Sequence, residues 1–151
     1  MNRHLVLLGF IALVLGGGTL IGYLAMPGEW YAGLQKPFFN PPNWIFGPVW
    51  SVLYVLVAVA GWRIWDLAPD GPAMRVWVAQ LVLNFLWSPI FFGLKLPGLA
   101  LVVIAGLLAA IVAFISLARQ IDRPAAWLFS PYAAWVAFAT LLNFSIWWLN
   151  R

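Results

Sequence analysis

The sequence predicts an all-α membrane protein, a five-transmembrane-helix bundle with a long lid loop between helices 1 and 2. Of its 151 residues, 65% are hydrophobic and only 8% are charged, whereas about a quarter of a soluble domain is charged. Five long runs lack Asp, Glu, Lys and Arg, and each is close to the roughly 20 residues that cross a bilayer core of about 30 Å. No run has the polar stripe of a water-facing helix. We expect one domain over residues 1–151, with helices over residues 5–26, 44–65, 74–94, 97–118 and 124–148.

The first run begins like a secretory signal, because Arg3 and His4 precede the apolar stretch LVLLGFIALVL. The apolar stretch continues to Met26, however, and no A-x-A cleavage site follows it. We therefore expect a retained membrane helix, and a cleaved signal is the alternative.

The stretch KPFFNPPNWIFGPVW, residues 36–50, holds four prolines, three phenylalanines and two tryptophans. Its first half belongs to the only long connection, which runs from Pro27 to about Asn43, and its second half runs into the second expected helix. Loops of this length in a compact domain are usually functional or disordered, and disordered segments are poor in aromatic residues. We therefore expect a lid that packs over one end of the bundle.

The other connections are short, so sequential helices should be antiparallel neighbours. Five spans place the termini on opposite sides of the membrane. The N-terminal side then holds five Lys or Arg residues and the other side three. This bias favours a cytoplasmic N-terminus in a bacterial inner membrane; an outer membrane is the alternative.

Residues for catalysis inside the membrane are missing from the sequence. The four acids, Glu29, Asp66, Asp70 and Asp122, lie at helix ends or in loops, His4 is the sole histidine, and there is no cysteine. The sequence therefore disfavours a metal site, a hydrolase and ion-coupled transport. The net charge of +4 is scattered, so no nucleic-acid partner is expected.

Nine of the eleven tryptophans fall into two groups by their position in the runs. Trp50, Trp87 and Trp135 lie inside their runs. The other group fits the aromatic belts at membrane interfaces and comprises Trp62, Trp65, Trp77, Trp127, Trp147 and Trp148.

Helical spacing gathers polar and aromatic side chains onto three faces. One face carries Gln80, Asn84, Trp87 and Ser88, a second carries Trp135, Ala139 and Asn143, and a third carries Trp50 and Tyr54. Amides in hydrocarbon need partners, so two interpretations stay open. The amides either form interhelical hydrogen bonds or face an aromatic cavity for a large, planar, apolar ligand.

Small residues recur at four-residue spacing in two runs, Gly18 with Gly22 and Ala105 with Ala109 and Ala113. This spacing fits either internal packing or a dimer face.

Three motifs, in order along the chain, resemble the TspO/MBR family, the tryptophan-rich sensory and mitochondrial translocator proteins. They are EWYAGLQKPFFNPPNWIFGPVWSVLY (residues 29–54), QLVLNFLWSPIFFG (residues 80–93) and PYAAWVAFATLLNF (residues 131–144). The resemblance covers nearly the whole chain.

The resemblance implies a bundle, commonly homodimeric, that binds porphyrins, sterols and benzodiazepine-type ligands under the loop between helices 1 and 2. The ligand would be held without a covalent bond and without a metal. Matching the motifs position by position implies a pocket of Tyr31, Pro41, Trp50, Tyr54, Asn84, Trp87, Trp135 and Ala139, with Trp30, Phe38 and Trp44 on the lid. The expected function is a receptor or sensor that regulates tetrapyrrole metabolism or a stress response. The alternatives are a light-dependent porphyrin-degrading enzyme, with Trp50 and Trp135 as its candidate catalytic residues, and a porphyrin or sterol transporter.

The sequence departs from the family's proposed cholesterol pattern, which requires a Tyr followed closely by Lys or Arg. Phe144 occupies the Tyr position and Trp148 occupies a position where some relatives carry Arg. This departure makes tetrapyrroles a simpler expectation than sterols.

Overall fold

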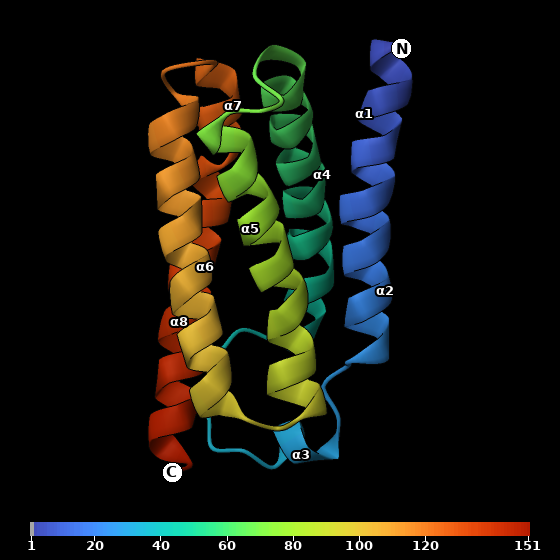
Figure 1. The fold of residues 1–151 in the computed structure, drawn as a ribbon. Helices are drawn as coiled ribbons and strands as arrows, with labels where there is room; N and C mark the ends of the chain where they lie inside the picture. The colour runs from blue at the N-terminus through green and yellow to red at the C-terminus, as the bar shows by residue number, and fades with distance from the viewer. Residues whose placement is uncertain (1) are drawn as a thin grey trace.

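A computed structural model describes residues 2–151, and every regular element in that range is a helix (Figure 1). Five stretches are long and apolar enough to cross a membrane, which confirms the predicted fold class: Arg3–Leu24, Asn43–Leu67, Pro72–Gly93, Pro97–Ala118 and Arg123–Leu149. The elements in chain order are α1 (Arg3–Ile11), η1 (Ala12–Gly16), α2 (Gly17–Leu24), α3 (Glu29–Ala32), α4 (Asn43–Leu67), α5 (Pro72–Ser88), η2 (Pro89–Gly93), α6 (Pro97–Ala118), α7 (Arg123–Leu128) and α8 (Ser130–Leu149). The η elements are π-helical turns within longer helices.

Proline sets where several helices begin. Pro72 and Pro97 are the first residues of α5 and α6, and Pro124 follows the first residue of α7. A proline is well tolerated in the first turn because its missing N–H has no intrahelical partner there. The tight link between η2 and α6 places Lys95 in the left-handed region, with φ of 59°.

The helices form an antiparallel bundle with the termini at opposite ends (Figure 1). α6 packs against both α5 and α8, and α1 and η1 pack against α4. The short α3 lies in the connection between α2 and α4 and covers the end of the bundle away from the N-terminus (Figure 1). The predicted lid is therefore part of the folded structure and covers one end of the bundle.

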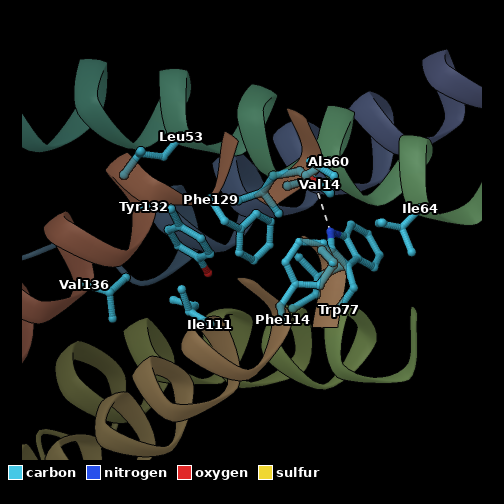
Figure 2. Close-up of a cluster of buried hydrophobic side chains, with 14 of the residues drawn as sticks. Val14, Leu53, Ala60, Ile64, Trp77, Ile111, Phe114, Phe129, Tyr132 and Val136 are labelled. Atoms are coloured by element: carbon cyan, nitrogen blue, oxygen red, sulfur yellow. Dashed lines mark hydrogen bonds between the residues drawn. The ribbon is translucent and has the colours of Figure 1, made fainter. Parts of the chain in front are cut away.

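The core is aromatic in the half of the bundle away from α3. The rings of Phe114 and Phe129 are in contact, with centroids 4.1 Å apart and an interplanar angle of 35°, and Figure 2 shows both beside Trp77 and Tyr132. Trp77 was expected in an interfacial belt, and this prediction is wrong because its side chain is only 2% exposed. Its indole Nε1 donates to the carbonyl of Val57 at 3.0 Å.

The position of Trp77 depends on a glycine of the neighbouring helix. A Cβ on Gly61 would overlap the indole ring, so the missing side chain lets α5 approach α4 here. The partner of the indole is a carbonyl that α4 already uses in its own helix. Sequence position near a helix start could not distinguish this arrangement from an interfacial tryptophan.

An ion pair joins two helices at the end opposite the lid. The Arg63 guanidinium donates from Nε to Asp122 Oδ2 at 2.6 Å and from Nη2 to Oδ1 at 3.1 Å. The same carboxylate caps α7 by accepting the backbone N–H of Ala125 at 3.2 Å. The bonds from Arg63, helped by the Ala125 N–H, hold the pKa of the Asp122 carboxyl below its ordinary value.

Replacing Asp122 by Asn should therefore destabilise the protein in a pH-dependent way. Asn still caps the helix but cannot pair with Arg63, so we expect a loss of up to about 1 kcal/mol at neutral pH. Because the pKa is lowered in the folded state, the ionised pair contributes fully above the unfolded value of about 3.9 and less as pH falls through the folded value. Thermal unfolding of both proteins in detergent, from pH 7 down to about pH 2, measures this.

The matched control is Asp70→Asn, because Asp70 has no salt bridge within residues 2–151. A difference between wild type and Asp122→Asn that stays constant into acid would contradict the assignment.

Candidate ligand cavity

A cavity of about 500 Å³ lies under the lid, between α2, α4, α5, α6 and α8. Seven residues of the predicted pocket line it, and they come from the lid and from three of these helices: Tyr31, Trp50, Tyr54, Asn84, Trp87, Trp135 and Ala139. The structure thus brings together residues that lie as much as 108 positions apart (139 − 31) in the sequence. The volume falls within the roughly 300–1,000 Å³ of small-molecule sites.

Four other predicted residues do not reach the cavity wall. Pro41 lies between Asn40 and Asn43, which do line it. Phe38 is 100% exposed and Trp44 is 73% exposed, so both side chains point away from the bundle. Trp30, on α3, packs edge-on against Phe91, with ring centroids 5.8 Å apart, and does not line the cavity. The motif match could not separate the side of the lid that faces inward from the side that faces outward.

Aromatic rings form the walls of the cavity. Trp50 lies against Tyr54, with centroids 5.4 Å apart, and Trp87 lies against Phe91 at 5.1 Å with an interplanar angle of 30°. On the α8 side, Trp135 meets Phe46 edge-on at 5.8 Å. Rings held by one another in this way present flat apolar surfaces to an occupant.

The two buried amides that line the cavity, Asn84 and Asn143, bond to neighbouring helices, as a hydrocarbon environment requires of polar groups. Asn143 accepts from Trp87 Nε1 at 2.9 Å and donates to the carbonyl of Pro97 at 2.9 Å. Asn84 Nδ2 donates to the hydroxyl of Tyr132 at 2.6 Å. Both amides also line the cavity. The two interpretations left open by the sequence therefore hold together, since the same residues join helices and face the cavity.

Two fully buried polar atoms of residues that line the cavity lack a protein partner. Within the described residues, Trp135 Nε1 and Asn40 Oδ1 are buried and make no hydrogen bond, although both residues line the cavity. Buried polar atoms are nearly always paired. One unpaired donor and one unpaired acceptor at the wall indicate places where an occupant could supply the missing bonds.

Charge is excluded from the cavity. Its lining, within residues 2–151, contains no Asp, Glu, His, Lys or Arg, and that part of the chain holds no cluster of metal-ligating residues. Burial raises the pKa of the Tyr31 phenol above its ordinary value, so the phenol is neutral at physiological pH. The arrangement can bind and orient a ligand but offers no acid–base pair for hydrolysis.

A latch ties the lid to the end of α8. The backbone N–H of Gln35 donates to Asn150 Oδ1 at 2.9 Å, and Asn150 Nδ2 donates to the Gln35 carbonyl at 2.8 Å. Nearby, the Lys36 ammonium donates to the carbonyls of Ala32 and Leu34 and lies 4.6 Å above the ring of Tyr31. The lid is therefore held by directional bonds as well as by aromatic packing.

The wall between α2 and α4 is built from small residues. A Cβ on Gly18 would collide with the ring of Tyr54, so the helices are close at that level. Nearer the lid, the lining of the two helices includes four small residues, Thr19 and Gly22 on α2 and Gly47 and Ser51 on α4, and all four are exposed.

Sequence reasoning missed several lining residues. Phe91 and Phe92 follow Trp87 by one turn in a motif already singled out, so helical spacing could have found them. Asn40 in the lid and the α2 residues carry no such signal, because their place depends on how the first span packs.

A shallower apolar hollow lies between α4 and α7. Its lining contains one charged group, Arg63, which is already paired with Asp122.

Comparison with known proteins decides the family. The sequence model of the TspO/MBR family matches residues 10–149. The chain belongs to the TspO/MBR family. It is 39% identical to the tryptophan-rich sensory protein of Cereibacter sphaeroides over 99% of this chain and 95% of that protein. It is 43% identical to the tryptophan-rich protein TspO of Archaeoglobus fulgidus over 80% of each, and 38% identical to the translocator protein of Homo sapiens over 86% of this chain and 82% of the human protein.

Membership in the TspO/MBR family agrees with the five membrane spans and establishes an integral multi-pass membrane protein. The curated relatives are named as sensory and translocator proteins. These names support a role in the membrane as a receptor or sensor.

The latch yields a prediction that needs no ligand. Asn150→Ala removes both bonds to Gln35, so the lid should open more often, and the Gln35 amide should exchange about fivefold faster, the change that one hydrogen bond contributes. Hydrogen–deuterium exchange of residues 28–40, followed by mass spectrometry, measures this. Ser145→Ala is the control, because the Ser145 hydroxyl bonds only within α8, to Leu141. Equal exchange in all three proteins would mean that the latch does not hold the lid.

Proposed function

We propose that the protein is a membrane receptor that binds a porphyrin-type tetrapyrrole under the lid and acts as a sensor in tetrapyrrole metabolism or stress. The observation that carries the proposal is an uncharged cavity with indole walls and isolated polar groups. A tetrapyrrole is a large, flat, apolar ring with polar groups at its centre and edge, so it matches these walls in shape and chemistry. Smaller aromatic ligands of the benzodiazepine type fit the same description.

The polar groups of the cavity support binding rather than turnover. Trp135 Nε1 offers a donor and Asn40 Oδ1 an acceptor without protein partners, and the groups around them are neutral. The name of the Cereibacter relative, a sensory protein, favours a signalling role over simple storage. The lid latch provides an element whose state could depend on whether the cavity is filled.

Two substitutions test the proposed site. Asn84→Ala removes an amide from the cavity wall while Tyr132 keeps its bond to Gln80, so the fold should remain intact and protoporphyrin affinity should fall about fivefold. Ala139→Thr adds bulk to the wall and should also lower affinity. Quenching of tryptophan fluorescence by protoporphyrin, titrated in the dark in detergent, gives each Kd.

Thr140→Ala is the matched control, because the Thr140 hydroxyl bonds to Val136 within α8 and the residue does not line the cavity. If both cavity variants bound as tightly as wild type, the ligand would have to bind elsewhere on the protein.

A second candidate function is light-dependent degradation of the porphyrin. It is favoured by one observation, that Trp50 on α4 and Trp135 on α8 both line the cavity. Such a reaction needs no acid–base pair. A photoexcited porphyrin can take an electron from a nearby indole and pass it to molecular oxygen as superoxide, the indole radical can recover an electron from the porphyrin, and superoxide can then add to the oxidised ring.

The double variant Trp50→Phe with Trp135→Phe separates the two functions. For an enzyme, illuminated wild type should form a new absorbing species that the double variant does not form, while dark binding persists in both. Trp65→Phe is the control, since Trp65 lies outside the cavity. For a receptor, saturable quenching should continue in light with an unchanged porphyrin spectrum.

A further inference from the structure

Three buried polar side chains form a chain that runs from the cavity into the bundle. Asn84 Nδ2 donates to the Tyr132 hydroxyl at 2.6 Å, and that hydroxyl donates to Gln80 Oε1 at 2.8 Å. Gln80 and Tyr132 are both 0% exposed. Of the three, only Asn84 lines the cavity, so a hydrogen bond from this chain reaches a ligand through Asn84.

The direction of these bonds decides what Asn84 offers to the cavity. Its Nδ2 is engaged by Tyr132, whereas no hydrogen bond within the described residues uses its Oδ1. The wall therefore presents a carbonyl oxygen, which accepts a hydrogen bond from a ligand N–H or O–H. Asn143 cannot play this part, because its oxygen already accepts from Trp87, and the unpaired oxygen of Asn40 lies in the lid and not on this chain of side chains.

The same three side chains could also bond in the opposite direction. A tyrosine hydroxyl is both a donor and an acceptor. If both amides turned over, Gln80 would donate to Tyr132, and Tyr132 would donate to Asn84. The Asn84 NH₂ group would then face the cavity, and the wall would offer a donor instead of an acceptor.

The observed direction requires Gln80, because Gln80 Oε1 is the acceptor for the Tyr132 proton. Without that acceptor, the hydroxyl would be left with a buried proton, and the nearest remaining oxygen in the chain belongs to Asn84. Packing alone would not favour glutamine at position 80, since burying the Gln80 Nε2 without a partner in residues 2–151 costs stability. A leucine at this position would fill similar space without that cost.

We propose that Gln80 is a positioning residue that acts through Tyr132 to set the direction of the hydrogen bond that Asn84 offers to a ligand. With Gln80 present, the cavity prefers ligands that carry an N–H or O–H donor. The inference rests on the proposed function, because it requires that the cavity bind a ligand.

The test compares two planar probes on wild type and on Gln80→Leu. Protoporphyrin IX dimethyl ester carries inner N–H groups, whereas its four-coordinate nickel(II) complex has neither N–H nor O–H donors and the same ester groups. Both dissociation constants are measured in the dark by tryptophan fluorescence quenching. We expect Gln80→Leu to shift the ratio of the two values about fivefold toward the nickel complex, the effect of one hydrogen bond.

A thermal unfolding midpoint at or above the wild-type value would show that Gln80→Leu is well folded. The variant Gln80→Leu with Tyr132→Phe is the second arm, because it leaves the Asn84 amide free to turn either way and its ratio should lie between the other two. Should Gln80→Leu fail to fold, the single variant Tyr132→Phe takes its place and must move the ratio in the same direction.

The outcomes separate the two proposals. If wild type binds neither probe, the proposed function fails, and this inference fails with it. If wild type binds but the ratio is the same in all folded variants, the cavity remains a porphyrin site and the role of Gln80 is overturned. A ratio that moves while the midpoint stays constant supports positioning, since a purely structural residue would change stability and leave the ratio alone.

Discussion

In hydrocarbon, a polar group needs a hydrogen-bonding partner from the protein, and this requirement governs the structure. Helices satisfy the backbone, and the few polar side chains inside the spans are left to satisfy one another. Trp77 bonds to a carbonyl of α4, Asn143 joins α5 to the start of α6, and Tyr132 joins two amides of α5 to α8. The polar groups thus fix how the helices meet. Because two of these connections border the cavity, the bonds that hold the bundle together also shape its interior.

The fold could be predicted from the sequence because its causes are local along the chain. Runs of apolar residues as long as a bilayer is thick gave the five spans, and prolines gave the starts of α5 and α6. The position of Trp77 could not be predicted. It depends on a glycine sixteen residues earlier, on a different helix, whose missing Cβ leaves room for the ring. A pattern within one helix contains no information about such a contact.

The candidate site was predictable to the extent that helical spacing and family motifs describe it. Spacing gathered Asn84 with Trp87 and Trp135 with Ala139, and the structure directs both faces into one cavity. Tyr132 shares the helical face of Trp135, three residues away, so its position was predictable, but its bonds to α5 were not. The lid was the least predictable part. Its prolines give it an irregular path, so no period tells which of its aromatic rings points inward, and Phe38 is fully exposed.

The small residues between α2 and α4 leave part of the cavity lining exposed on two membrane spans. Thr19, Gly22, Gly47 and Ser51 line the cavity and are exposed there. Apolar molecules prefer acyl chains to water by about 0.8 kcal/mol for each CH₂ group. The fraction of cavities that hold a ligand then depends on the moles of ligand per mole of lipid, and not on the moles of ligand per litre of sample. Empty vesicles or extra detergent would drain the cavity by dilution alone, and an affinity stated without the lipid content of the sample would have no fixed meaning.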